Sequence, residues 1–158
     1  MGGNSYAAAD EDRPLAGYVA LMGAYAVSAA ALALGARRKP ERRLGAFDLA
    51  VVALATHKLS RLITKDSISS ALRAPLVRYV EPAGGGEVNE EVRVDGALHA
   101  LGELVICPVC IDVWVATAFV GGFVFAPRLT RAAASVLSVI ALSNAAHYGW
   151  DALKQSAE

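Results

Sequence analysis

The stretch GELVICPVCIDVWVATAFVGGFV, residues Gly102 to Val124, decides how the chain is organised. It joins a Cys-Pro-Val-Cys knuckle, Cys107 to Cys110, to a long apolar run. Counted from Leu104, that run is long enough for a helix to cross the ~30 Å hydrocarbon core of a bilayer. The sequence therefore predicts the knuckle and a transmembrane helix together over residues 105–126.

The composition of the whole chain agrees with a membrane protein. Hydrophobic residues make up 55% of the 158 residues and charged residues only 19%, with a mean hydropathy of +0.41. This is too apolar for an ordinary soluble domain of one-domain length, so we expect the lipid bilayer as the main partner. The 15 basic residues balance the 15 acidic ones and form no basic face with interleaved aromatics, so no nucleic-acid partner is expected.

Working outward, two further apolar segments are predicted to be transmembrane helices. Residues 15–36 contain 22 residues without a charge, and residues 132–153 follow a short turn at 127–131. Residues 1–14 are small, polar and acidic, which predicts a disordered tail. Five of the seven residues in 37–43 are basic, and the positive-inside rule places this stretch in the cytoplasm.

The segment 44–63 admits two interpretations. Its apolar residues recur at helical spacing, while Asp48, Lys58 and Arg61 lie elsewhere on the helical wheel. It is therefore either a transmembrane helix or an amphipathic helix in the membrane interface. Residues 64–104 are predicted to be a polar connection with a short helix at about 69–80, interrupted at Pro75, and a flexible acidic loop after Pro82.

The two interpretations place the cysteines on opposite sides of the membrane. If 44–63 spans, seven Lys and Arg residues are inside and six outside; if it lies on the surface, twelve are inside and three outside. The second charge count is much better, and on balance the sequence leans slightly to a cytoplasmic knuckle. Four packed helices would bury a better core, which favours the first. The fold class expected in both cases is an all-α integral membrane bundle of three or four transmembrane helices.

Three stretches together resemble a known protein family. They are HKLSRLITKDSI from His57, Arg73-Ala-Pro75, and GELVICPVCIDVW from Gly102. This combination resembles the bacterial domain-of-unknown-function family 1360, a family of small membrane proteins, over about residues 46–150. The resemblance implies a multi-pass protein of the cytoplasmic membrane and supplies no reaction, because the family has no established activity. Val109 and Ile111 depart from the aromatic and small residues that the family carries at these places.

The cysteine pair admits three functions. A Cys-x-x-Cys pair at a helix start favours the thiolate and hence thiol–disulfide exchange. Membrane oxidoreductases of this kind carry a second cysteine pair, however, and Cys107 and Cys110 are the only cysteines here. The pair also supplies two of the four ligands that zinc needs, with His99 as a third candidate and Asp112, Glu103 or a second protomer as a fourth. Otherwise the cysteines simply pack at the helix start, and no cofactor is expected.

Seven further ionisable residues lie near the predicted membrane segments and are candidates for a polar network. They are Asp48, His57, Arg61, Asp66, Arg73, Glu103 and Asp112. An ionisable group in lipid is costly unless it is paired, so pairs such as Arg61 with Asp112 or Arg73 with Asp66 are expected. Salt bridges that fix the helix register are favoured over a proton or solute pathway.

The sequence alone therefore favours a non-enzymatic membrane protein with an accessory or assembly role, with a homo-oligomer or a membrane-protein partner. A membrane thiol–disulfide redox protein that uses Cys107 and Cys110 is the alternative, and a channel- or transporter-like oligomer is a third hypothesis. No Ser/His/Asp set, phosphate-binding loop or pair of catalytic carboxylates can be placed.

Overall fold

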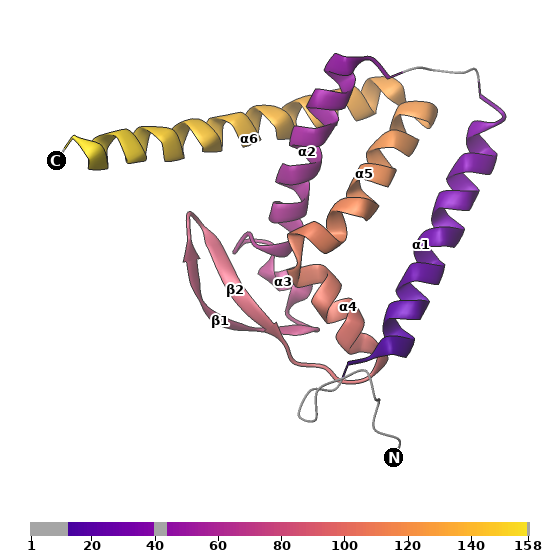
Figure 1. Ribbon diagram of the computed structural model, residues 1–158, viewed down its shortest axis with the longest axis horizontal. Coiled ribbons are helices and arrows are strands. Elements are labelled where there is room, and N and C mark those ends of the chain that lie inside the picture. Colours follow the sequence, from indigo (N-terminus) through magenta and orange to yellow (C-terminus); the bar gives the residue numbers. More distant parts are fainter. Residues whose placement is uncertain (1–12, 40–43, 158) are drawn as a thin grey trace.

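The computed structural model describes residues 13–39 and 44–157, which leaves most of the predicted tail, and part of the basic stretch, outside the described residues. The described elements are α1 (Leu15–Ala36), α2 (Ala46–Thr64), α3 (Ser70–Arg73), β1 (Val77–Gly84), β2 (Glu87–Val92), α4 (Ala97–Ile106), α5 (Pro108–Phe125) and α6 (Pro127–Ser156). Figure 1 shows α1, α5 and α2 side by side, with α3, α4 and the strands at one end of this layer.

Helix α1 packs along α4 and α5 in the same direction. A Cβ atom at Gly17 would lie 2.7 Å from the Cβ of Ala100, so only glycine allows this approach near the start of α1. Midway, the Tyr25 hydroxyl lies 2.9 Å from that of Thr117. Near the other end, a Cβ at Gly35 would lie 2.8 Å from the Phe125 ring. The contacts of Tyr25 with Thr117 and of Gly35 with Phe125 follow one another in the same order along the two helices. Helices α1 and α5 are therefore parallel.

Helix α2 runs in the opposite direction and lies at the centre of the core. The buried core consists of Val52 and Ala55 of α2, Val115, Phe119 and Phe123 of α5, and Ala134 of α6. At the start of α2, Asp48 binds Arg131, and the Arg131 guanidinium lies 5.4 Å from the centre of the Phe123 ring. The beginning of α2 therefore meets the end of α5, which makes the two helices antiparallel.

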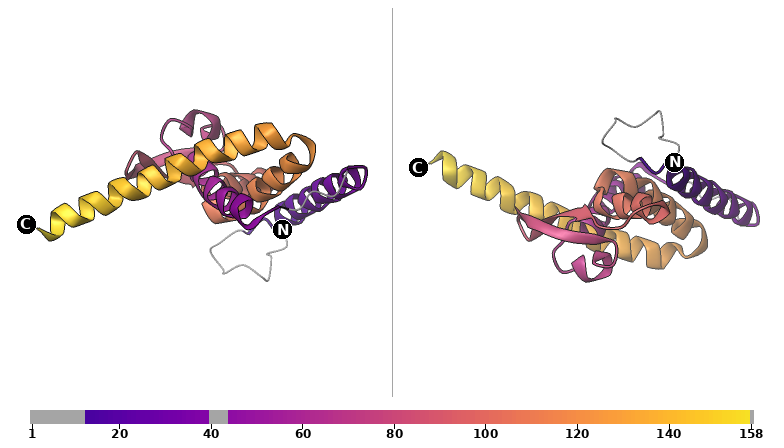
Figure 2. Two further views of the ribbon diagram at one scale, coloured as in Figure 1. Left: turned by 90° about the horizontal axis from the view of Figure 1, so that it is seen from above. Right: turned by 90° about the horizontal axis from the view of Figure 1, so that it is seen from below.

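Helix α6 begins at Pro127, so the predicted turn over 127–131 is wrong. Proline suits the first position of a helix because its fixed φ is helical and its missing N–H would have no partner there. The Ser138 hydroxyl donates to the carbonyl oxygen of Val51 at 2.7 Å, which holds α6 across α2. Beyond this crossing α6 leaves the layer, and its C-terminal part projects from the rest of the molecule (Figure 2).

The structure is mostly helical, but the all-α expectation is wrong in one respect. Residues predicted as a short helix and an acidic loop form the antiparallel hairpin β1–β2, with Val77 opposite Val92 and Tyr79 opposite Glu90. The helix that starts at Ser70 ends at Arg73, just before Pro75. Gly84, Gly85 and Gly86 all have positive φ (85°, 59° and 83°) and turn the chain at the tip without steric cost.

Within the described residues, three helices are long and apolar enough to cross a membrane: α1, α5 and α6. Their bounds include the segments that the sequence predicts at 15–36 and 132–153, and most of the one at 105–126. Helix α2 is not among them, because Asp48, Lys58 and Arg61 lower its apolar character.

Candidate functional site

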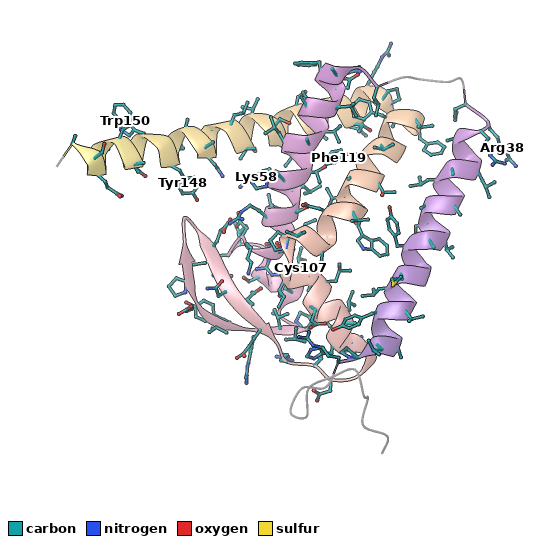
Figure 3. All side chains as sticks on the ribbon, in the orientation of Figure 1. Arg38, Lys58, Cys107, Phe119, Tyr148 and Trp150 are labelled. Carbon is teal, nitrogen blue, oxygen red and sulfur yellow. A yellow bond between two sulfur atoms is a disulfide. The ribbon has the colours of Figure 1, made fainter. Side chains whose placement is uncertain are left out.

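The cysteine pair lies at the bend between α4 and α5, where Figure 3 labels Cys107. Cys107 ends α4 and caps α5 in an extended conformation, and Pro108 occupies the first helical position. The Cys107 Sγ accepts a hydrogen bond from the backbone N–H of Cys110 at 3.2 Å. The two side chains form a disulfide with a Cα–Cα distance of 5.2 Å. Cys107 is half-buried and Cys110 is exposed, so the disulfide is accessible at the surface of the protein.

A groove of about 480 Å³ opens beside the disulfide, between α1 and α4. It is lined by Tyr18, Leu21, Ala100, Glu103, Leu104, Ile106, Cys107 and Cys110. Its one polar end is made by Glu103, which accepts hydrogen bonds from the Tyr18 hydroxyl at 2.5 Å and from Arg13 at 3.2 Å. The rest of the lining is apolar apart from the two sulfur atoms.

The predicted zinc ligands are not gathered around the cysteines. His99 Nδ1 lies 3.0 Å from the carbonyl oxygen of Val94, and its Nε2 lies 3.8 Å from Glu103. Nothing in the described part of the chain groups three or more His, Cys, Asp or Glu side chains where they could hold a metal ion. Sulfur atoms joined in a disulfide offer no thiolate ligands, so this arrangement represents the oxidised pair.

The predicted polar network is distributed over separate ion pairs, and the two suggested pairs do not form. Arg61 binds Glu87 of the hairpin, with its Nε 2.8 Å from the carboxylate, instead of Asp112. Arg73 binds Glu90 at 2.5 Å instead of the Asp66 carboxylate. The partners Glu87 and Glu90 were missed because the hairpin that carries them was predicted to be a flexible loop.

Arg73 is the most buried charged residue of the network, and its partners hold parts of the fold together. Its side chain is 3% exposed and that of Glu90 is 4% exposed. The guanidinium also donates to the carbonyl oxygens of Ile63 and Asp66 and to the Ser69 hydroxyl. These bonds tie the end of α2 to α3 and the hairpin. They occupy the N–H groups of the Arg73 guanidinium, so none is left to bind a ligand.

A smaller, more polar pocket of about 240 Å³ lies between α2, the hairpin and α6. Its lining residues are His57, Lys58, Arg61, Glu87, Ala141, Asn144, Ala145 and Tyr148. Figure 3 shows Lys58 and Tyr148 on the two sides of the wedge between α2 and α6. The Lys58 Nζ lies 3.0 Å from the side-chain amide of Asn144, and Arg61 binds Glu87, so both cations already have protein partners.

Asp112 stands apart from the other predicted network members. One of its carboxylate oxygens is buried and has no hydrogen-bond partner, and the same holds for the hydroxyls of Thr56 and Ser60 on α2. Asp48, in contrast, pairs with Arg131 through two hydrogen bonds of 3.0 Å. The network therefore contains three kinds of site: paired surface charges, the buried Arg73 pair, and an unpaired carboxylate oxygen two residues beyond Cys110.

Comparison with known proteins supplies a family and no activity. No curated protein and no solved structure matches the chain. A model of a family of proteins of unknown function, DUF1360, matches residues 51–150. The match runs from α2 into α6 and includes the hairpin, the disulfide and every predicted network residue except Asp48, while α1 lies outside it. This confirms the resemblance seen in the sequence: the chain belongs to the DUF1360 family of proteins of unknown function.

Proposed function

We propose that this chain is a multi-pass membrane protein that exchanges the Cys107–Cys110 disulfide with thiols of a partner protein on the non-cytoplasmic side of the membrane. The observation that carries the proposal is the exposed disulfide at the N-terminus of a membrane-length helix. Such exchange would also serve the assembly role that the sequence suggests, because it acts on other proteins while they form or rearrange disulfides.

The surface of α1 supports insertion into lipid. Val19, Met22 and Val27 are 68%, 71% and 71% exposed, although they are large and apolar. Soluble proteins rarely leave a continuous apolar surface open to water, whereas a bilayer covers it at no cost. Val120 of α5 and Val139 of α6 are also exposed, so the apolar surface extends over all three membrane-length helices.

The directions of the helices support α2 as a crossing between α1 and α5. Helices α1 and α5 lie side by side and parallel, as the contacts of Tyr25 with Thr117 and of Gly35 with Phe125 require. Two parallel spans need a return crossing between them in the chain. Helix α2 is antiparallel to both and packs against α5 through the core, so it is placed to be this crossing. Asp48 lies near its start, and Lys58 and Arg61 lie in its C-terminal half, where both reach polar partners.

With α2 as a crossing, the basic stretch supports one orientation of the bundle, although the count of twelve basic residues inside and three outside favours the topology in which α2 does not cross. The connection between α1 and α2 carries five basic residues in the seven of 37–43, which predicts the cytoplasmic side. The segment 64–104 at the other end has four basic and seven acidic residues. Glutamates of the hairpin neutralise Arg73 and Arg78 of this segment and Arg61 just before it. The disulfide then lies outside, in the compartment where disulfides persist.

The local geometry supports different roles for the two sulfurs. The Cys107 Sγ accepts the N–H of Cys110 and sits at the positive end of the α5 dipole, so Cys107 is the better leaving thiolate. Cys110 is the more exposed residue of the two, so we place the attack there. Exchange is fastest when the attacked sulfur is accessible and the leaving thiolate is stabilised.

The reaction then has two balanced steps. A partner thiolate attacks Cys110 Sγ, a new disulfide forms, and the Cys107–Cys110 bond breaks with its electron pair on Cys107. A second partner thiolate attacks the partner sulfur of this mixed disulfide and releases Cys110 as a thiolate. The partner dithiol loses two electrons and two protons, and the two cysteines of this chain receive them.

The proposal is tested with purified protein in lipid nanodiscs and a fluorescent peptide that carries two thiols. Wild type should oxidise one peptide dithiol per protein chain. Given the peptide in its disulfide form, the Cys107→Ser variant should attack it through Cys110 and form a mixed disulfide as the second peptide sulfur leaves as a thiolate, and an alkylating quench traps this species. The matched Cys110→Ser variant should form less, because Cys107 is less exposed. The variant with both serines is the control. Peptide that stays reduced with wild type, together with no trapped species in either single variant, would overturn the proposal.

A further inference from the structure

We infer that the groove beside the disulfide binds a lipid-soluble quinone, which re-oxidises Cys107 and Cys110 after each exchange. This inference rests on the proposed exchange activity. The chain contains no cysteine other than these two, so no second cysteine pair of its own can remove the electrons that exchange leaves behind. A repeated reaction therefore needs a two-electron acceptor that can reach the sulfur atoms.

The groove has the size and chemistry for such an acceptor. Its volume of about 480 Å³ lies within the ~300–1,000 Å³ range of small-molecule sites. Its apolar walls come from Leu21 of α1 and from Leu104 and Ile106 of α4, and both cysteines form one part of the lining. In the proposed topology the groove lies between two helices at the membrane edge, so a ligand dissolved in lipid enters without crossing water.

The polar end of the groove suits a quinone carbonyl. The Tyr18 hydroxyl and the Glu103 carboxyl share a hydrogen bond of 2.5 Å, and both line the groove. A quinone has an apolar ring, which suits the apolar walls of the groove, and two carbonyl oxygens that accept hydrogen bonds. The Tyr18 hydroxyl donates to Glu103 in this structure, and rotation about its C–O bond would direct the same proton to a quinone oxygen. A fatty acid or a phosphate headgroup fits less well, because the anion Glu103 would repel a second negative charge there.

The electron transfer balances with the groups present. The Cys107 thiolate adds to a ring carbon of the quinone: a C–S bond forms, the ring C=C π bond breaks, and its electron pair moves onto a carbonyl oxygen, which takes up a proton. The Cys110 thiolate then attacks Cys107 Sγ, the disulfide forms again, and the C–S bond breaks with its electron pair on the ring. The two thiol protons end on the two oxygen atoms, so the dithiol is oxidised to the disulfide and the quinone is reduced to the hydroquinone.

The test uses the reduced full-length protein in nanodiscs and a short-chain ubiquinone. Loss of quinone absorbance and loss of maleimide-reactive thiols are followed together, and wild type should reduce one quinone per chain with saturable kinetics. A free peptide of sequence Cys-Pro-Val-Cys gives the background rate. We expect Leu104→Trp, which fills the groove, and Tyr18→Phe, which removes its donor, each to slow re-oxidation at least tenfold while peptide exchange is kept.

Leu98→Trp is the matched control, because Leu98 lies on α4, is 54% exposed and does not line the groove. It should re-oxidise at the wild-type rate. If wild type exchanges with the peptide but the quinone re-oxidises it no faster than the free peptide, the quinone inference is overturned and the exchange function stands. The quinone inference is also overturned if Tyr18→Phe and any folded Leu104→Trp keep the wild-type rate. If wild type does not exchange at all, the proposed function itself fails.

Discussion

The hydroxyl oxygen of Tyr25 in α1 lies 2.9 Å from that of Thr117 in α5. The Tyr25 ring also meets Trp114 edge to face, with ring centroids 5.3 Å apart. These contacts lie between the Gly17 and Gly35 contacts and hold the two helices in parallel. The proposed crossing of α2 depends on this arrangement, because two adjacent parallel spans require α2 to return through the membrane.

Enlarging Gly17 should separate α1 from α4. A Cβ there meets the Cβ of Ala100 at 2.7 Å and the carbonyl oxygen of Ala97 at 3.1 Å, so Gly17→Val must push the helices apart. Overpacking of this kind costs about 1–3 kcal/mol. The measurement is thermal unfolding in nanodiscs. Gly23→Val is the matched control on the same helix, since nothing lies within 4 Å of a Cβ at Gly23; equal losses in both variants would contradict the packing described.

The crossing of α6 over α2 should be equally sensitive to size. Ala134 is fully buried against the core, so Ala134→Leu is expected to cost about 1–3 kcal/mol through overpacking. Ala132, two residues earlier on α6, is exposed, and Ala132→Leu should leave stability unchanged. Unfolding in nanodiscs compares the two variants. A stable Ala134→Leu protein would mean that α6 does not pack on α2 as described.

The buried pair of Arg73 and Glu90 should matter far more than a surface pair in the same hairpin. Arg73→Gln leaves Glu90 charged, 4% exposed and without its ionic partner, which is expected to cost about 3–5 kcal/mol. Arg78 and Glu91 are 66% and 52% exposed, so Arg78→Gln should cost about 0–1 kcal/mol. Chemical denaturation measures both.

A double substitution separates the cost of leaving Glu90 unpaired from the cost of losing the other hydrogen bonds of Arg73. Replacing both partners, Arg73→Met with Glu90→Leu, removes the unpaired charge and should recover much of the stability lost in Arg73→Gln. A double variant as unstable as Arg73→Gln would show that the bonds of Arg73 to the carbonyl oxygens of Ile63 and Asp66 are the larger contribution.

The apolar helices could be predicted from the sequence because length and hydrophobicity are local properties. The 22 uncharged residues of Leu15–Ala36 define α1 to the residue. The hairpin could not be predicted in the same way. Val77 and Val80 suit the hydrophobic period of a helix, and Glu87, Glu90 and Glu91 together with three glycines are typical of a loop. The structure pairs these two weak segments across the glycine tip.

The partners of the candidate site depended on this hairpin. Arg61 and Arg73 were expected to find acidic partners, but Glu87 and Glu90 face them only once β2 folds back along β1. Asp48 finds Arg131 across 83 positions of the chain because α6 starts beside α2. The cysteine pair, in contrast, could be placed at a helix start from Pro108 and the apolar run alone, since its geometry is set within four residues.

The measurement that tests the central claim most directly is labelling of intact cells with a membrane-impermeant maleimide. The account predicts that Cys107 and Cys110 are labelled without permeabilisation, and only after treatment with an impermeant reductant, because they form a disulfide outside the membrane. Lys39→Cys in the Cys107→Ser, Cys110→Ser background marks the opposite end of the bundle and should be labelled only after permeabilisation. If labelling of Cys107 and Cys110 requires permeabilisation, the pair lies on the same side of the membrane as the basic stretch 37–43. That result would contradict both the topology and the proposed exchange.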